Sequence, residues 1–250
     1  YIYYLLSILD LRGYITGSAQ PKLNQENLAG IQLQLPNINR QNKVAQILSC
    51  IDNKIEINNK INSELEVMAK TIYDYWFLQF EFPNEKGKPY KSSGGKMVWN
   101  EEVKREIPDG WKVKKVEETC TTLLGGTPNT KKEDFWNGNI PWLSSGELES
   151  SLVLQSEKKI TELGKENSAT AFAPKGSVLL SITRYIRPAI LGIDACFNQS
   201  VVAIIPNEQY HTAFLYPFLL SQVDRYMSLR TGAQQPHINK EIIDKTHIIC

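Results

Sequence analysis

The stretch VAQILSCIDNKIEINNKINSELEVMAKTIY, residues 44–73, repeats its apolar residues with the seven-residue period of a coiled coil. No Gly or Pro occurs between Asn37 and Phe82, so we predict one continuous helix over residues 37–82, about 70 Å long at 1.5 Å per residue. A helix of this length extends beyond its own domain and needs a partner helix. An ordinary core helix is the alternative that the pattern leaves open.

With Val44 at heptad position a, eight of the ten a and d positions are apolar. Lys54 and Asn58 interrupt the seam, and polar residues at such positions typically fix register or pairing at some cost in stability. The predicted subunit and helix interface is therefore this seam: Val44, Ile47, Ile51, Lys54, Asn58, Ile61, Leu65, Met68, Ile72 and Tyr75.

Eleven residues occur twice in nearly the same form, as TGSAQPKLNQE at 16–26 and TGAQQPHINKE at 231–241. A period this long indicates a duplicated domain rather than a solenoid. In each copy we predict a tight turn at the glycine, a helix capped by the asparagine, and an upstream apolar helix that runs into the Thr-Gly pair. At the offset of 215 the identical residues are Thr16, Gly17, Gln20, Pro21, Asn24 and Glu26, matching Thr231, Gly232, Gln235, Pro236, Asn239 and Glu241.

The rest of the chain mixes strand and helix signals. Ile31, Leu33 and Leu35 alternate with glutamines, which predicts a half-buried strand. Residues 83–107, rich in Pro, Gly, Ser and Lys, are predicted to be a linker. Short β-rich segments follow in residues 108–250. The predicted fold class is α+β: a mixed or antiparallel-sheet domain attached to a long coiled-coil helix.

The composition excludes several classes of protein. The chain is 42% hydrophobic, yet no apolar run approaches the roughly 18 residues of a membrane span, and no signal pattern opens it, so we expect a cytoplasmic protein without membrane contact. The four cysteines lie 50 or more residues apart and the three histidines have no ligand spacing, which predicts neither a disulfide framework nor a metal site. The net charge of +1 decides nothing about nucleic acid, because acidic segments can offset a basic face.

Catalytic signatures are largely missing from the sequence. It contains no phosphate-binding loop, no dinucleotide fingerprint and no nucleophile elbow. Asp109 with Glu157 and Lys159 can be fitted to the acidic pair and lysine with which restriction-type nucleases hold Mg²⁺. The turn character of Pro108-Asp109-Gly110 and the separation of the two halves argue against this match.

Three segments offer groups suited to DNA contact. Lysines and short polar side chains gather in residues 123–148, paired arginines flank a Tyr-Ile in residues 179–192, and amides occur in the second repeat. Lysines and hydroxyls suit phosphates, whereas the arginine fork suits guanine and glutamine suits adenine. A polar loop with a core tryptophan, a hairpin with two surface arginines, and glutamines that cap their own turn are the alternatives. The predicted DNA-binding residues are Thr127, Asn129, Lys131, Lys132, Ser144, Ser145, Arg184, Tyr185, Arg187, Gln234, Gln235 and His237.

Together these features resemble the specificity subunits of type I restriction–modification systems. The residues that carry the resemblance occur along nearly the whole chain. They are residues 34–83, IPDGWKVKKV at 107–116, LLGGTPNTKKEDFWNGNIPWLSSGEL at 123–148, GSVLLSITR at 176–184, ACFNQSVVAI at 195–204 and TGAQQPHIN at 231–239.

The resemblance implies two target-recognition domains joined by two antiparallel helices that act as a ruler between the halves of a split DNA site. It implies a non-catalytic subunit that carries methyltransferase subunits, with a motor nuclease joining to cut; S-adenosylmethionine, ATP and Mg²⁺ then belong to the partners, and this chain needs no cofactor. By the same resemblance, residues 1–36 end the first recognition domain, 37–82 form the first ruler helix, and 108–250 form the second recognition domain.

On this resemblance the chain looks like a piece of the family pattern, with a second ruler helix expected after Cys250. We therefore predict antiparallel self-association through the unpaired helix 37–82, or poor solubility. Two alternative functions stay open: a single-chain restriction enzyme that contains this specificity region, and a coiled-coil adaptor without a DNA role. The target sequence, the half-site spacing and the division between base and phosphate contacts do not follow from the sequence.

Overall fold

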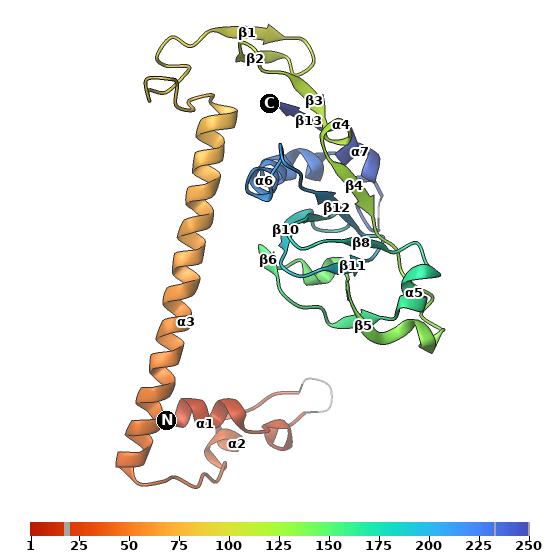
Figure 1. Ribbon diagram of the computed structural model, residues 1–250. Helices are drawn as coiled ribbons and strands as arrows, with labels where there is room; N and C mark the ends of the chain where they lie inside the picture. The colour runs from red at the N-terminus through yellow and green to blue at the C-terminus, as the bar shows by residue number, and fades with distance from the viewer. Residues whose placement is uncertain (18–20, 233, 250) are drawn as a thin grey trace. The chain divides into compact units, whose positions relative to one another are not determined.

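The computed structural model describes residues 1–17, 21–232 and 234–249 in two compact units, Tyr1–Met68 and a second that begins at Ala69 (Figure 1). Gln20 of the first repeat and Cys250 lie outside the described residues. None of the described helices is long and apolar enough to cross a membrane.

The first unit contains helices α1 (Ile2–Ile8), η1 (Arg12–Tyr14), α2 (Gln25–Ala29) and most of α3 (Ile38–Tyr73). Two local predictions are wrong here. Helix α1 ends at Ile8 instead of running into Thr16, because the Asp10 carboxylate accepts hydrogen bonds from the Arg12 amide at 3.1 Å and from its guanidinium at 2.7 Å. Residues 31–35 form no strand, since the described part of the chain gives them no strand to pair with.

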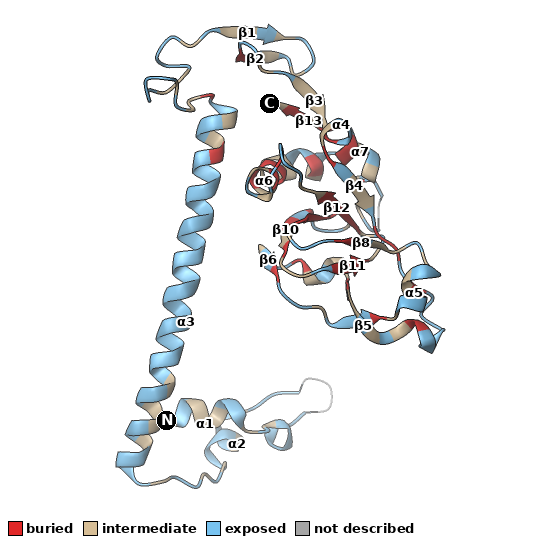
Figure 2. Cartoon of the chain, viewed as in Figure 1, coloured by how far each residue is buried: buried red, intermediate tan, exposed pale blue. Residues whose placement is uncertain are grey.

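Helix α3 begins as predicted, because the Asn37 side chain accepts a hydrogen bond from the Arg40 amide at 3.0 Å and caps the first turn. It continues through a π-helical turn, η2 (Asp74–Leu78), and stops four residues before the predicted end. Phe80 takes a left-handed φ of 61°, and the Glu81 amide donates to the Tyr75 carbonyl at 2.8 Å, a Schellman-type closure. Most of α3 is exposed (Figure 2).

The second unit is built on two sheets with mixed strand directions, which confirms the predicted fold class. The five-stranded sheet has the order β4-β12-β9-β10-β6 and the four-stranded sheet the order β7-β5-β11-β8; only the pairs β10·β6 and β11·β5 are parallel. Their bounds are β4 Thr121–Leu124, β5 Trp136–Leu143, β6 Leu152–Val153, β7 Lys158–Ile160, β8 Ala171–Ala173, β9 Val178–Ser181, β10 Arg187–Leu191, β11 Ala195–Phe197 and β12 Val201–Ile205.

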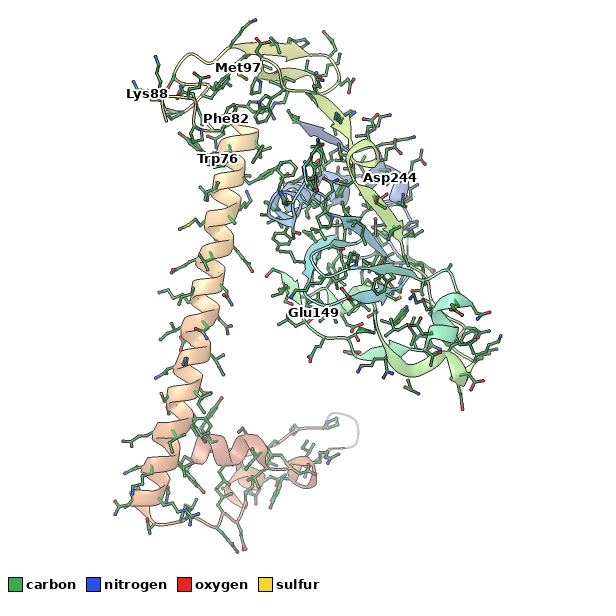
Figure 3. The ribbon with its side chains drawn as sticks, in the orientation of Figure 1. Trp76, Phe82, Lys88, Met97, Glu149 and Asp244 are labelled. Atoms are coloured by element: carbon green, nitrogen blue, oxygen red, sulfur yellow. The ribbon has the colours of Figure 1, made fainter. Side chains whose placement is uncertain are left out.

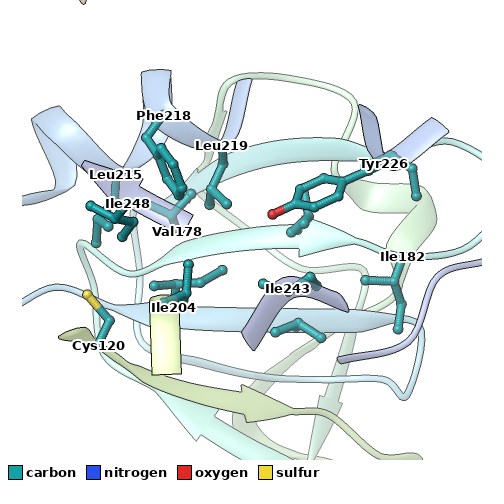
Figure 4. Packing of buried hydrophobic residues seen from close by; sticks show 14 of the residues in the cluster. Cys120, Val178, Ile182, Ile204, Leu215, Phe218, Leu219, Tyr226, Ile243 and Ile248 are labelled. Carbon is teal, nitrogen blue, oxygen red and sulfur yellow. The ribbon is translucent and has the colours of Figure 1, made fainter. Parts of the chain in front are cut away.

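The central strands are buried on both faces, so they are continuous apolar runs. Val178 and Leu180 of β9 point into a core with helices α6 (Thr212–Ser228) and α7 (Lys240–Asp244), whereas Leu179 packs toward the second sheet. Tyr226 of α6 is fully buried over this core (Figure 4). Its hydroxyl forms a hydrogen bond with the Thr246 hydroxyl at 2.8 Å. Short helices α4 (Val116–Thr119), η3 (Glu133–Phe135), η4 (Ser145–Glu147) and α5 (Glu162–Glu166) complete the unit.

The segment predicted as a linker, residues 83–107, carries regular structure. Strands β1 (Met97–Asn100) and β2 (Arg105–Pro108) form a hairpin, and β3 (Val113–Lys115) pairs with β13 (His247–Ile249). Phe82 stacks on Tyr90 and on Trp111, with ring centroids 4.7 and 5.0 Å apart (Figure 3 labels Phe82). The aromatic side chains therefore fold this segment onto the end of α3, whereas the proposed domain boundaries stay a prediction.

Candidate nucleic-acid interface

The register of the five-stranded sheet brings several predicted DNA-binding segments to one end. Leu124 at the end of β4 faces Val202, Val201 at the start of β12 faces Ser181, and Ser181 at the end of β9 also faces Arg187. Residues that follow β4, precede β12 and connect β9 to β10 consequently lie together. We call these segments the loop end: residues 125–127, 144–145, 198–200 and 182–187.

Close backbone approach at the loop end depends on a glycine pair. A Cβ added to Gly125 would lie 2.2 Å from the Asn198 carbonyl oxygen, and one added to Gly126 would lie 2.5 Å from the Ala169 carbonyl carbon. Because these backbones touch, Thr127 is exposed directly beside Gln199, and its hydroxyl donates to the Gln199 amide oxygen at 2.5 Å.

Two tryptophans hold the loop that carries Asn129 and the predicted lysines. The Trp142 indole N–H donates to the Gly126 carbonyl at 3.1 Å and the Trp136 indole N–H donates to the Asn129 carbonyl at 3.2 Å, while the two rings meet edge to face at 5.2 Å. The core-tryptophan alternative is thus correct for Trp142, which is buried, and the same ring supports the loop.

The side chains on this loop differ in how far they are already engaged in contacts. The Asn129 side-chain oxygen accepts from the Lys131 amide at 3.0 Å, so it shapes the turn. Lys131 is exposed, and the Lys132 ammonium lies 4.9 Å from the centroid of Phe135. Lys158 of β7 lies 5.9 Å from the Trp136 centroid and adds a cation that the sequence reasoning did not place here.

Ser144 and Ser145 follow β5 and stand beside Asn198, whose amide donates to the Leu143 carbonyl at 2.9 Å. The Ser144 hydroxyl and amide both donate to the Glu147 carboxylate, at 3.0 and 2.6 Å, in a capping box. Both serines are only half exposed. Their place is at the loop end, but the hydroxyl of Ser144 is engaged in its own turn.

The connection between β9 and β10 is the most exposed cationic part of the loop end. Arg184 has a left-handed φ of 62°, Tyr185 is 57% exposed, and the Arg187 guanidinium lies 4.8 Å from the Tyr185 ring centroid. This loop lies against the second repeat: the Arg184 amide donates to the Pro236 carbonyl at 2.9 Å.

The turn of the second repeat presents the predicted amides beside that loop. Gln234, Gln235 and His237 are exposed, and His237 forms a β-bridge with Thr183. The His237 ring nitrogen Nδ1 lies 3.1 Å from the Gln235 carbonyl oxygen. The predicted sites of three distant segments are therefore neighbours in the structure, as base readout requires.

Four exposed cations on this surface have no carboxylate partner among the described residues. Within residues 1–17, 21–232 and 234–249, no carboxylate forms an ion pair with Lys131, Lys132, Arg184 or Arg187. A phosphate would therefore meet no competing carboxylate at these side chains.

The residues fitted to a nuclease pattern are not brought together. Asp109 forms an ion pair with Lys96 at 3.0 Å, whereas the Glu157 amide donates to the Glu147 carboxylate at 2.8 Å. Across the described residues, no group of three His, Cys, Asp or Glu side chains is placed to hold a metal ion. Burial raises the pKa of the Cys120 and Cys196 thiols, which keeps them protonated.

The predicted helix interface is exposed to solvent. Exposed fractions include 63% for Ile47, 55% for Leu65 and 58% for Met68, while only Val44 is half-buried. The polar positions Lys54 and Asn58 are exposed as well, so the predicted seam stands without a partner in the described chain.

Sequence reasoning missed residues whose position depends on the fold. Gln199 is bonded to Thr127, the Thr170 hydroxyl donates to the Phe197 carbonyl at 3.0 Å, and the Arg230 guanidinium donates to the Arg184 carbonyl at 2.9 Å. Arg230 directly precedes the repeated Thr-Gly pair, which is the one local signal that could have drawn attention to it.

Comparison with known proteins confirms the resemblance. Residues 1–67 and 108–250 match the family Methylase_S, the type I restriction modification DNA specificity domain. The chain is 26% identical over 261 residues to the type I restriction enzyme MjaIX specificity subunit of Methanocaldococcus jannaschii, covering 100% of this chain and 58% of that protein. It is 36% identical over 104 residues to the EcoR124I/EcoR124II specificity subunit of Escherichia coli, covering 39% of this chain and 26% of that protein.

One solved structure supports the fold, and a second match is reported beside it. A chain from a structure on complex assembly and conformational transition of the type I R-M system matches with a TM-score of 0.50 at 14% identity, over 99% of this chain and 55% of that chain. The HsdS subunit from Thermoanaerobacter tengcongensis matches with a TM-score of 0.48 at 14% identity, over 94% of this chain and 52% of that one. The chain spans little more than half the length of these two structures and of the MjaIX subunit.

Proposed function

This chain belongs to the family of type I restriction–modification DNA specificity domains, and from that premise we propose that it binds double-stranded DNA by sequence as a specificity subunit. It reads half of a bipartite site, docks methyltransferase subunits and joins an assembly with a motor nuclease. The chain itself is non-catalytic, and S-adenosylmethionine, ATP and Mg²⁺ act on the partner subunits. Residues 1–36 end one recognition domain and 108–250 form the next.

The observation that carries the proposal is the loop end. Arg184 and Arg187 lie in an exposed connection without carboxylate partners, and this connection is hydrogen-bonded to the turn that carries Gln234 and Gln235. Arginine forks and glutamine amides are the groups that read guanine and adenine in the major groove. Lys131 and Lys132 extend the surface with charges suited to the phosphate backbone.

Helix α3 supports the second half of the proposal, the docking of subunits and the spacing of half-sites. Its a and d residues from Ile47 to Tyr75 leave an apolar stripe in water, interrupted at Lys54 and Asn58. Such a stripe is the seam of a helix pair, and the polar interruptions restrict which register or partner it accepts.

The test is a binding series on a preferred duplex, selected from a randomised library, and on random duplexes. Arg184→Ala is expected to lose about 1–3 kcal/mol on the preferred duplex only, while Lys131→Ala weakens binding to all sequences and lowers the salt slope by about one unit. Equal losses on both duplexes would remove Arg184 from base reading. Cutting or methylation by the full chain without partner subunits would instead favour the single-chain enzyme.

A further inference from the structure

The loop that presents Arg184 has a backbone that an arginine adopts only when it is held. Its φ of 62° is left-handed, a region that residues with a Cβ rarely occupy. Such a conformation persists where the surrounding structure fixes it, and here the surrounding structure is the end of α6 and the second repeat.

Three hydrogen bonds hold the loop from one short segment. The Arg184 amide donates to the Pro236 carbonyl at 2.9 Å, the Ile238 amide donates to the Ile182 carbonyl at 3.0 Å, and Arg230 Nη1 donates to the Arg184 carbonyl at 2.9 Å. Both backbone groups of Arg184 are thus bonded to residues 230–238.

Arg230 is itself anchored to the helix. Its Nε donates to the carbonyl of Met227 in α6 at 3.0 Å, so one guanidinium joins the last turn of the helix to the strained residue. A planar fork with several donors can serve two carbonyls at once, whereas a lysine ammonium on its flexible stem holds no such fixed angle. Arg230 is half-buried, which suits a bracing role better than a phosphate contact.

The turn that follows Arg230 is closed on itself. Thr231 and His237 exchange backbone hydrogen bonds of 2.9 Å in both directions, and Gly232 has a φ of 102°. The φ of Gly232 favours glycine, and a Cβ there would make a tight contact of 3.1 Å with the Gln235 carbonyl oxygen.

We propose that Arg230 is a positioning residue for base readout, and that the repeated turn 231–238 is the clamp that fixes the Arg184 loop. This rests on the proposed function, since it assumes that the loop reads DNA. The first repeat has the equivalent bridge, between Thr16 and Lys22, and a φ of 101° at Gly17. Ile15 stands where Arg230 stands in the second, so the arginine brace belongs to the second copy alone.

The experiment compares Arg230→Lys with the wild type, each in the full chain assembled with its methyltransferase subunits. Binding to a randomised duplex library, followed by sequencing of the bound fraction, measures sequence preference, and the salt slope on random duplex measures phosphate contact. Arg225→Lys is the matched control, because Arg225 lies in the last turn of α6, to which Arg230 is anchored, and it reaches Thr246 instead of the loop. Gly232→Ala is a second variant that disturbs the turn without touching Arg230.

Arg230→Lys is expected to lower the ratio of preferred to random affinity about tenfold and leave the salt slope unchanged, since the charge is kept. Amide exchange at Arg184 and Tyr185 should accelerate in Arg230→Lys and Gly232→Ala but not in Arg225→Lys. Unchanged preference and unchanged exchange in both variants would overturn the clamp and leave DNA reading intact. A wild type that binds without any sequence preference would refute the proposed function, and exchange would then decide the clamp by itself.

Discussion

Arg184 gives the sharpest test, because its left-handed backbone lowers the stability of the fold whereas its side chain is proposed to strengthen DNA binding. The left-handed conformation costs a residue with a Cβ roughly 1–2 kcal/mol, and glycine avoids that cost. Glycine loses more backbone entropy on folding, by about 0.5–1 kcal/mol. Arg184→Gly should therefore raise the free energy of unfolding by about 0.5–1 kcal/mol, a rise in Tm of about 2 °C for a unit of this size.

The same substitution should abolish readout by this residue. Arg184→Ala removes the guanidinium but keeps the Cβ, so both variants lose the same 1–3 kcal/mol on the preferred duplex. Only the glycine variant gains stability, by about 1 kcal/mol over the alanine variant. When backbone strain is located at a functional residue, a substitution that relieves the strain is expected to stabilise the fold and to weaken function.

Urea unfolding by circular dichroism gives the stability and fluorescence anisotropy gives the DNA affinity. Arg187→Gly is the matched control: Arg187 begins the extended strand β10, where glycine costs about 0.5–1 kcal/mol instead of relieving strain. The reasoning is refuted if Arg184→Gly is no more stable than Arg184→Ala, or if both arginine positions respond to glycine with the same sign.

Three further outcomes follow from the packing. Trp111→Ala should lower the free energy of unfolding by about 3 kcal/mol in urea titrations, because the indole packs against three phenylalanine rings at the end of α3. Burial raises the pKa of Tyr226 to about 12, whereas the unfolded chain keeps the ordinary value of 10.0. The contribution of Tyr226 to the free energy of unfolding is therefore fully present below pH 10, and it falls by up to about 1.4 kcal/mol per pH unit toward pH 12. Tyr226→Phe should remove the contribution of Tyr226 to that dependence, at a cost of about 1 kcal/mol for the lost Thr246 bond, as measured by unfolding at several pH values. Leu65→Glu should reduce concentration-dependent association, measured by light scattering, because it places a charge in the exposed seam of α3.

Each of these has its own control. Trp99→Ala removes an exposed indole outside this ring cluster. If it lowered the free energy of unfolding as much as Trp111→Ala, the ring cluster would not explain the effect at Trp111. Tyr73, whose pKa is also raised to about 12 by burial, maintains half of the alkaline dependence in Tyr226→Phe; a profile identical to the wild type would contradict the assignment. Ser63→Glu alters an exposed position outside the seam, and a wild type that stays monomeric at all concentrations would count against self-association.

Local chemistry explains which parts of the fold the sequence predicts well. The repeated turns need φ values that glycine supplies, and Gly17 and Gly232 have φ of 101° and 102°. Asn24 and Asn239 cap helices that begin at Gln25 and Lys240, the same offset of 215 residues. A turn and a cap depend on neighbours in the chain, so a short pattern determines them.

The errors arise where structure depends on distant partners. The alternating residues 31–35 have the correct period for a strand, but a strand also needs hydrogen-bond partners. The Pro- and Gly-rich segment 83–107 has the composition of a linker, yet the aromatic stack of Phe82, Tyr90 and Trp111 orders it. No local pattern records that those three rings meet.

The candidate site also has a part that the sequence predicts, its residue types, and a part that it does not predict, their arrangement in space. Its residue types were predictable, since arginine, lysine, glutamine and hydroxyl side chains suit DNA. Their assembly depends on strand register, which places Thr127, Arg184 and His237 at one end of the unit. Strand register also brings Gln199 next to Thr127. The local turn ties the Ser144 hydroxyl to Glu147, so this hydroxyl is already hydrogen-bonded. The spacing of residues in the sequence predicts neither result.

The second repeat links the two ends of this unit through a short path. From Arg230 the path clamps the Arg184 loop and enters α7, whose Asp244 accepts a hydrogen bond from the Thr122 hydroxyl at 2.6 Å. It continues into β13, which pairs with β3, and β3 begins two residues after Trp111. Trp111 packs on the last turns of α3. Each step is a hydrogen bond or a ring contact, so a shift of the Arg184 loop relative to the end of α3 would break several of them. If α3 sets the spacing of half-sites, these contacts transmit that spacing to the residues that read the bases. A substitution that breaks them should then reduce the selectivity for half-site spacing and the selectivity for base sequence together.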